Sequence, residues 1–281
     1  MSAALDDIRG WVFDVDGCLV RTTRAGGKGG VPFPGAIEIM ELLHDRGDEV
    51  VVCTNASELP PAVYAAHLRD IGLPVRDDAF VTAGSAAADH VLAHHPGARV
   101  LVVGAEGVTE PMRERGITLA APGEELADVV VVGAASSYET PVLNAAALAV
   151  AAGAAFYTTV DSPWFSGGIR RSLAVSAAIA ASIEFATGRK AEVAGKPSAV
   201  LAESLLRRLG VDGAASAVVG DAPAEIRLAH HMGGTGILLL SGATTQSDAD
   251  DLTGPTRPEI VLDDIAVLHR RLAPQTTRQG A

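Results

Sequence analysis

Two carboxylates stand close together at the end of an apolar run near the N-terminus. The stretch GWVFDVDGCLV, residues 10–20, passes through Trp11 and Phe13 and then places Asp14 and Asp16 two positions apart. The end of a buried strand is a costly place for charge unless a ligand or counter-ion compensates it. One carboxylate there can act as a nucleophile while the other transfers protons. The alternative is a turn or a cap that merely follows the strand.

Two further apolar runs also end in polar residues. EVVVCTNAS places Thr54 and Asn55 after one run, and SAVVGDAPAE places Asp221 after another. In open parallel sheets, ligands bind beyond the carboxyl ends of strands, near the point where the strand order reverses. These polar residues are therefore expected to meet Asp14 and Asp16 in a single site.

Several acids in one place repel each other unless a cation neutralises them. Mg²⁺ prefers a few carboxylates together with phosphate and water oxygens, which makes a phosphorylated ligand plausible here. Phosphoryl transfer also needs positive charge near the transferred group. Lys196, in the segment AGKPSAV before a helical pattern, can supply it. Asp221 has an alternative role as the N-cap of the helix that starts near Pro223.

The elements that must position these residues are apolar runs alternating with amphipathic segments. Continuous β-branched runs are typical of strands covered on both faces in a parallel sheet, and their alternation with helices indicates a doubly wound α/β fold. Residues 85–190 repeat the pattern without a polar strand end, which predicts an inserted second domain between residues 1–84 and 191–281. The runs that predict strands are 11–15, 49–53, 79–83, 99–104, 128–133, 154–159, 216–221 and 236–240, with helical patterns such as 35–47 and 199–210 between them.

Composition restricts the function classes. The net charge of −12 argues against an electrostatic nucleic-acid binder. The first residues lack the basic and apolar regions of a secretory signal, and no apolar segment is as long as a membrane span. Cys18 and Cys53 are far apart and lie in apolar runs, as buried thiols do in reducing compartments. A cytoplasmic protein without membrane partners is expected.

At this point the motifs match a known family. DVDGCLV, VVVCTNAS, AGKPS and VVGDAPAE, in this order, resemble the four motifs of the haloacid dehalogenase superfamily of phosphohydrolases. The long interval before the lysine is similar to that of the NagD-like and p-nitrophenyl phosphatase branch, subfamily IIA, which carries a large α/β cap. Similarity continues in the insert, notably in VDSPWFSGG, and covers roughly residues 8 to 270. It implies a Rossmann-like core with an inserted α/β cap domain.

The resemblance also implies roles for single residues. Asp14 would attack phosphorus and bind Mg²⁺, and Asp16 would act as general acid and base and offer its backbone carbonyl to the metal. Thr54 would hydrogen-bond the phosphoryl group, and Lys196 would orient Asp14 and neutralise its phosphorylated form. Asp221 would bind Mg²⁺ directly or through water.

The remaining candidates concern the substrate and the outer part of the metal site. The resemblance places Asn55 beside the substrate. Glu225 stands where the family usually has a second aspartate in its last motif, so it is either an outer-shell metal acid or an acid in the first turn of a helix. In the cap, Asp161, Trp164 and Arg170 are candidates for substrate contacts, because Arg can clamp an anion and Trp can stack on a ring. The alternative for these three is an ordinary surface loop.

Together these observations predict a Mg²⁺-dependent phosphomonoester hydrolase. It would act through an aspartyl-phosphate on a small phosphorylated metabolite, and the resemblance leaves a homodimer open. One alternative is a phosphotransferase or mutase acting on a sugar phosphate. Another is a non-catalytic relative of the family that only binds a phosphate ligand.

Overall fold

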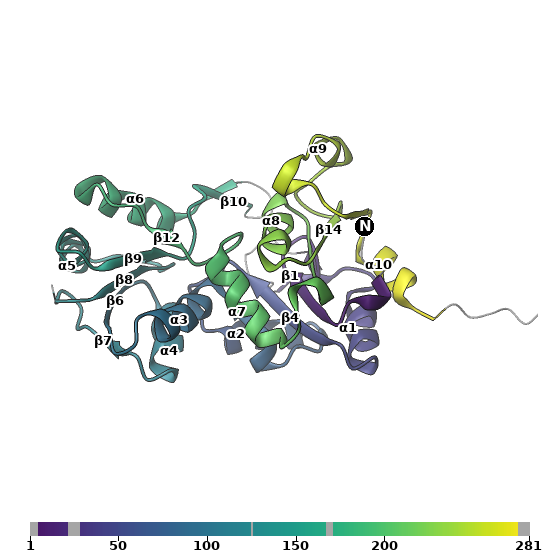
Figure 1. The fold of residues 1–281 in the computed structure, drawn as a ribbon, viewed down its shortest axis with the longest axis horizontal. Coiled ribbons are helices and arrows are strands. Elements are labelled where there is room, and N and C mark those ends of the chain that lie inside the picture. The colour runs from purple at the N-terminus through teal and green to yellow at the C-terminus, as the bar shows by residue number, and fades with distance from the viewer. Residues whose placement is uncertain (1–4, 22–28, 125, 167–170, 275–281) are drawn as a thin grey trace, which may run out of the picture.

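The computed structural model describes residues 5–21, 29–124, 126–166 and 171–274. In these ranges the chain forms two parallel sheets, each flanked by helices, and the two α/β units lie side by side (Figure 1). The predicted fold class, a doubly wound α/β core with an α/β insert, is confirmed. None of the helices in the described ranges is long and apolar enough to cross a membrane.

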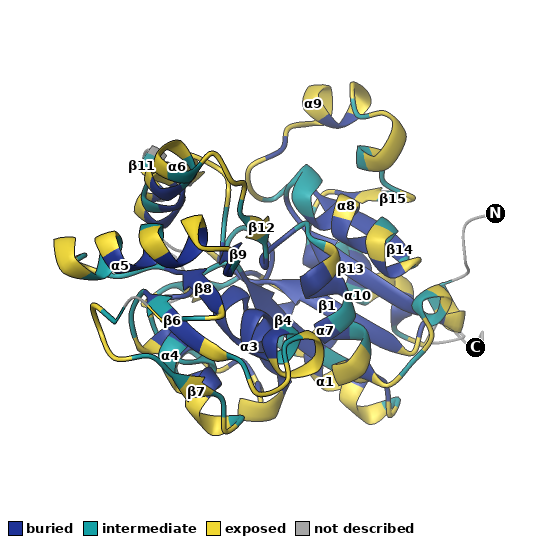
Figure 2. Cartoon of the chain, turned by 60° about the vertical axis from the view of Figure 1, so that its left-hand side comes forward, coloured by how far each residue is buried: buried dark blue, intermediate teal, exposed yellow. Residues whose placement is uncertain are grey.

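The larger sheet has six parallel strands in the order β15-β14-β13-β1-β4-β5. Strand β1 lies near its middle, with Phe13 opposite Val52 on one side and Val219 on the other. Its five residues are all buried because helices cover both faces (Figure 2). The strands are β1 (Gly10–Asp14), β4 (Glu49–Thr54), β5 (Phe80–Thr82), β13 (Ser216–Gly220), β14 (Thr235–Leu239) and β15 (Ile260–Leu262).

Alternate residues of β1 pack into two different cores. Trp11 and Phe13 belong to a cluster formed with α1 (Ala36–Asp45), α2 (Pro61–Asp70) and α10 (Ile265–Leu272). Val12 points to the other face and packs against α7 (Ala199–Leu209) and α8 (Pro223–Met232). The continuous apolar run of β1 thus reflects burial on both faces of the sheet. Helix α7 ends before Gly210, whose φ of 65° gives a left-handed C-cap.

The insert has its own parallel sheet in the order β12-β9-β8-β6-β7. Helices again cover both of its faces, and its last strand lies just beyond residue 190. The strands are β6 (Arg99–Val103), β7 (Thr118–Leu119), β8 (Val129–Val132), β9 (Ala155–Thr158) and β12 (Glu192–Val193), and the helices are α3 (Ala83–His94), α4 (Glu106–Glu114), α5 (Thr140–Ala151) and α6 (Val175–Thr187).

Short elements complete the described chain. Two antiparallel hairpins pair β2 (Val20–Arg21) with β3 (Val31–Pro32) and β10 (Trp164–Ser166) with β11 (Arg171–Leu173). The remaining elements are α9 (Gln246–Asp250) and the 3-10 turns Leu5–Asp7, Asp77–Ala79, Gly213–Ala215 and Gly254–Thr256.

The two units are joined where the chain crosses between their sheets. The first crossing leads from β5 into α3, whose first turn is capped reciprocally by Thr82 and Ser85. The second leads from β12 through Lys196 into α7. Between the crossings, Ser57 of the core donates a hydrogen bond to Thr159, which follows β9, at 3.0 Å.

Candidate active site

The catalytic candidates come from three neighbouring strand ends, as predicted. Asp14 is the last residue of β1 and pairs in register with Cys53 of β4, so Thr54 follows beside it. On the other side of β1, strand β13 ends at Gly220, directly before Asp221. Because all three strands are parallel, their carboxyl ends share one edge of the sheet.

Asp16 lies in a tight turn directly after β1. The Val20 N–H donates to the Val15 carbonyl at 2.9 Å, and the Gly17 N–H donates to the Val20 carbonyl at 3.0 Å. Gly17 has a φ of +87°, and a Cβ at this position would lie only 2.2 Å from Asp221 Oδ2. Glycine is therefore required both by the turn and by the close approach of Asp221.

Lys196 lies between two carboxylates. Its Nζ forms an ion pair with Asp14 Oδ1 and a second one, of 2.8 Å, with Glu225 Oε1. The side chains of all three residues are buried. The contact with Asp14 matches the role inferred from the family resemblance, and the contact with Glu225 was not expected.

Glu225 serves both the helix and the site. It lies in the first turn of α8, where its Oε2 accepts the Ala222 N–H at 3.1 Å while its Oε1 faces Lys196. Ala222 is the N-cap of α8, so the alternative that assigned this position to Asp221 is wrong. With both oxygens engaged, Glu225 acts as a second counter-ion for the lysine.

Asn55 holds the lysine in place. Its Oδ1 accepts the Lys196 backbone N–H at 2.6 Å, and its Nδ2 donates to the Lys196 carbonyl at 3.2 Å. The turn continues with the Ser198 N–H donating to the Gly195 carbonyl at 2.9 Å, and Ser198 then caps α7. The family resemblance places Asn55 beside the substrate, and in the structure its two side-chain hydrogen bonds fix the backbone that carries the lysine.

The loop after β14 also belongs to the site, although no motif pointed to it. The Ala243 N–H donates to Asp221 Oδ2 at 2.6 Å, and Thr244 Oγ1 donates to the Asp221 carbonyl at 2.6 Å. Ser241 Oγ donates to the Gly17 carbonyl at 2.7 Å, which links the loop to the turn after β1. The signal in the sequence was the last of the apolar runs, GILLL, which is also followed by polar residues, SGATT.

Burial and crowding perturb the protonation of the acids. Burial raises the pKa of Asp14 to about 8, with Glu225 and Asp221 adding to the rise and Lys196 opposing it. The pKa of Asp221 rises to about 6 through burial and the charge of Glu225. Burial alone would lower the pKa of Lys196, but Asp14 and Glu225 raise it well above its ordinary value, so the lysine stays charged.

This donor set fits a hard divalent cation. Asp14 and Asp221 are buried carboxylates at the same sheet edge, and together with Glu225 they outnumber the single ammonium group of Lys196. A divalent cation relieves such an excess of buried negative charge, and oxygen ligands of this kind suit Mg²⁺. The residues that would hold the metal are Asp14 and Asp221, with Asp16 on the adjoining turn.

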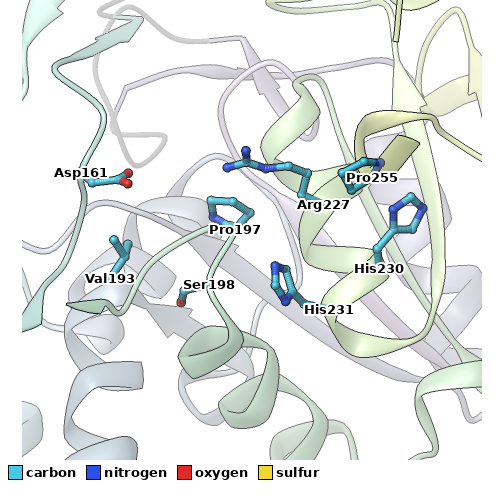
Figure 3. A pocket seen from close by; sticks show the side chains of 8 residues that line it. All are labelled: Asp161, Val193, Pro197, Ser198, Arg227, His230, His231 and Pro255. Carbon is cyan, nitrogen blue, oxygen red and sulfur yellow. The ribbon is translucent and has the colours of Figure 1, made fainter. Parts of the chain in front are cut away.

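A cleft of about 540 Å³ lies between the two units and reaches the residues directly after Lys196 (Figure 3). Asp161 lines it from the insert, and the Arg227 side chain of α8 extends toward the same space from the core. Trp164 is instead 47% exposed on β10, and Arg170 lies outside the described residues. The lining residues are Asp161, Val193, Pro197, Ser198, Arg227, His230, His231 and Pro255.

The motifs of the site lie in segments that match known family profiles. A family profile described as haloacid dehalogenase-like hydrolase matches residues 11–118, and a second profile, described as HAD-hydrolase-like, matches residues 193–268. The two matched segments contain all the carboxylates and the lysine of the site.

Two relatives match along most of the chain. The ribonucleotide monophosphatase NagD of Escherichia coli is 29% identical over 260 residues, 92% of this chain and 97% of its own length. The D-glycerol 3-phosphate phosphatase of Mycobacterium tuberculosis is 32% identical over 243 residues, 85% of this chain and 67% of its own length.

Solved structures agree in fold. A 4-nitrophenylphosphatase from Thermotoga maritima aligns with a TM-score of 0.85 at 27% identity, covering 96% of this chain and 99% of that one. A glycerol phosphate phosphatase from Mycobacterium tuberculosis, solved in complex with magnesium, aligns with a TM-score of 0.82 at 27% identity, covering 96% of this chain and 79% of that one. The chain thus belongs to the haloacid dehalogenase-like hydrolases, in the NagD and p-nitrophenyl phosphatase branch of capped phosphatases.

Proposed function

We propose that this phosphatase hydrolyses phosphomonoesters of small metabolites, with Mg²⁺ as cofactor and an aspartyl-phosphate on Asp14 as intermediate. The observation that supports this most directly is the buried Asp14–Lys196–Glu225 arrangement beside Asp221. An ammonium group fixed against a buried carboxylate can neutralise the negative charge that the carboxylate acquires when it is phosphorylated.

Each residue then has one task. Asp14 attacks phosphorus in line with the departing alcohol, and Asp16 protonates that alcohol and later takes a proton from the attacking water. Thr54 donates a hydrogen bond to the phosphoryl group, and Asn55 keeps Lys196 in position. When bound by Asp14, Asp221 and the Asp16 carbonyl, Mg²⁺ supplies further charge neutralisation.

The insert, predicted as residues 85–190 and extended in the structure by the start of α3 at Ala83 and by β12 (Glu192–Val193), acts in this proposal as a cap over the catalytic core that the sequence predicts for residues 1–84 and 191–281. Closing such a cap excludes bulk water during the transfer. The cleft that contains Asp161 and Arg227 adjoins the turn of Lys196 through Pro197 and Ser198, although the catalytic carboxylates do not line it, and the part of the substrate beyond the phosphate would extend into it. Relatives named as phosphatases of ribonucleotides and of D-glycerol 3-phosphate support a small phosphorylated metabolite as substrate.

The test is phosphate release from nucleoside monophosphates, sugar phosphates, glycerol phosphate and p-nitrophenyl phosphate, with Mg²⁺ and with EDTA. Wild type should release phosphate only with Mg²⁺, and Asp14→Asn should be inactive on every compound. Asp45→Asn, on the exposed end of α1, is the matched control and should retain full activity. Undiminished turnover by Asp14→Asn would overturn the mechanism.

A second measurement separates hydrolysis from the alternatives. Acid-quenched wild type incubated with a ³²P-labelled substrate should carry label that Asp14→Asn lacks. Adding sugar alcohols as acceptors distinguishes a phosphotransferase, because label would then appear on the acceptor instead of as free phosphate. A protein that only binds its ligand would show neither label nor release.

A further inference from the structure

A second group of metal-type side chains lies away from the carboxylate site, between α3 and α7. His90 and His94 are four residues apart on α3, in the segment HVLAH, and therefore share one face of the helix. Glu203 of α7 reaches the same point, because α3 and α7 pack against each other. Among the described residues, this is the group of three whose ligand atoms all lie within 4.8 Å of one another.

We propose that His90, His94 and Glu203 form a second metal site, suited to Zn²⁺ or a similar transition metal. Two imidazoles and one carboxylate are ligands that Zn²⁺ commonly takes, with water in a fourth position. The site would be independent of the Mg²⁺ centre, whose oxygen-only donors favour a different class of cation.

The distances agree with a shared ion. His94 Nε2 lies 3.1 Å and His90 Nδ1 lies 3.8 Å from Glu203 Oε2. Ligands bound tetrahedrally to zinc at about 2.1 Å are about 3.4 Å apart. The two imidazole nitrogens lie within 4.8 Å of each other, so the side chains would have to move closer together to share one metal.

A hydrogen-bonded chain orients the buried imidazole. His90 Nε2 lies 3.2 Å from the Tyr157 hydroxyl, and His95 Nε2 lies 2.7 Å from the same hydroxyl. If His90 Nε2–H donates to Tyr157 and Tyr157 donates to His95, the lone pair of His90 remains on Nδ1. Metal-binding histidines usually have such a partner on the ring nitrogen that does not bind the metal.

Hydrogen bonds alone do not satisfy every polar atom in this group of side chains. His90 Nδ1 is buried and has no hydrogen-bond partner within the described part of the chain, although its ring is only 12% exposed. It faces the Glu203 carboxylate, which offers no proton to it when ionised. Burial and the neighbouring His94 lower the pKa of His90, so the ring stays neutral and able to bind a metal near neutral pH. A cation bound there would give His90 Nδ1 a partner, and Glu203, whose Oε1 also accepts from Arg207 at 2.7 Å, would bind it through Oε2.

The position of the site suggests what the metal would do. Helix α3 starts directly after the first crossing between the sheets, and α7 starts directly after the second. Tyr157, which orients His90, belongs to strand β9 of the insert. A metal bound here would cross-link the two helices at the junction of core and insert.

The test uses protein purified without a histidine tag, with excess Mg²⁺ present to occupy the carboxylate site. Wild type should bind one equivalent of Co²⁺ with the visible absorption bands of a four-coordinate ion, and Zn²⁺ should displace it. Glu203→Gln and His94→Ala, both on partly exposed side chains, should abolish the bands. Tyr157→Phe should weaken Zn²⁺ binding by about 10- to 100-fold, as expected of an outer-shell partner.

The controls separate this site from the catalytic one. Asp14→Asn should bind Co²⁺ like wild type, so the outcome does not depend on phosphatase activity. His44→Ala, which removes an exposed histidine at the end of α1, should also leave the spectrum unchanged. The proposal is refuted if wild type shows no saturable Co²⁺ or Zn²⁺ binding, or if Glu203→Gln and His94→Ala bind as tightly as wild type.

Discussion

Replacing Asp14 with Asn should abolish turnover and also stabilise the protein when it is free of metal. The pKa of Asp14 is raised from 3.8 to about 8, chiefly by burial. Each pKa unit corresponds to about 1.4 kcal/mol, so ionising this carboxylate in the folded state costs about 6 kcal/mol relative to the unfolded chain at high pH. At pH 7, about 4 kcal/mol of that cost applies. Asn has nearly the same shape and carries no charge, so it avoids this cost.

The sign of the pH dependence follows from the two pKa values. Because the folded-state pKa of Asp14 lies above the unfolded value, its contribution to stability is complete below about pH 4 and is lost as the pH rises to about 8. Asn does not titrate. The advantage of Asp14→Asn should therefore be absent near pH 4 and largest above pH 8. For 281 residues, 4 kcal/mol at pH 7 corresponds to about 7 °C in Tm.

Thermal unfolding in EDTA at several pH values between about 4 and 9 measures this difference. Saturating Mg²⁺ should stabilise wild type more than Asp14→Asn and so reduce the gap. Asp161→Asn, at an exposed carboxylate, is the control and should follow wild type at every pH. If Asp14→Asn is no more stable than wild type at pH 8 in EDTA, the ion pair with Lys196 outweighs burial, and the reasoning fails.

Three further outcomes are expected. Asn55→Ala removes both side-chain hydrogen bonds to the Lys196 backbone. Leaving a buried hydrogen-bonding group without its partner costs about 1–3 kcal/mol, so kcat should fall by about 10- to 100-fold. Steady-state assays should show a smaller change in KM. Gly242→Ala would place a Cβ 1.9 Å from Asp221 Oδ2 and should weaken Mg²⁺ binding measured by calorimetry. Gly29→Ala meets no atom within 4 Å and only strains a backbone with a φ of +66°, so it should leave Mg²⁺ binding unchanged. Mg²⁺ binding should release protons near pH 7 and tighten as the pH rises, because the pKa values of Asp14 and Asp221 are raised to about 8 and about 6. Calorimetry in buffers of different ionisation enthalpy would detect this proton release. Equal binding heats in all buffers would contradict it.

Much of the site was predictable because parallel strands determine it. Asp14, Thr54 and Asp221 each follow an apolar run, and the ends of neighbouring parallel strands must share one edge of the sheet. The order of the motifs added Lys196, which lies far away in sequence. The fold class followed in the same way, since continuous apolar runs alternating with amphipathic segments leave few other architectures.

The partners of individual side chains were not predictable. The contact of Glu225 with Lys196 depends on how α8 is rotated, and the sequence left a helix acid and a metal acid equally open. Asn55 bonds to the Lys196 backbone because the segment that contains Lys196 returns from the insert and passes beside Asn55. The sequence does not show where this segment returns. The loop containing Ala243 binds Asp221 through a backbone N–H. Any residue other than proline can supply such a group, so no residue type in the sequence identifies this loop as part of the site. Such contacts arise from tertiary packing, which local patterns do not encode.

The return crossing between the sheets has a consequence for building chimaeras of this protein. Val193 is the last residue of β12 in the insert, and Lys196, held by Asn55 of the core, follows only three positions later. Gly195 between them has no space for a side chain, since a Cβ would lie 2.3 Å from the Thr159 carbonyl oxygen. The two junctions of the insert are therefore unequal. The entry junction at α3 carries none of the proposed catalytic residues, whereas the exit junction tolerates no change of length, because a single added residue would move the lysine out of register with its aspartate.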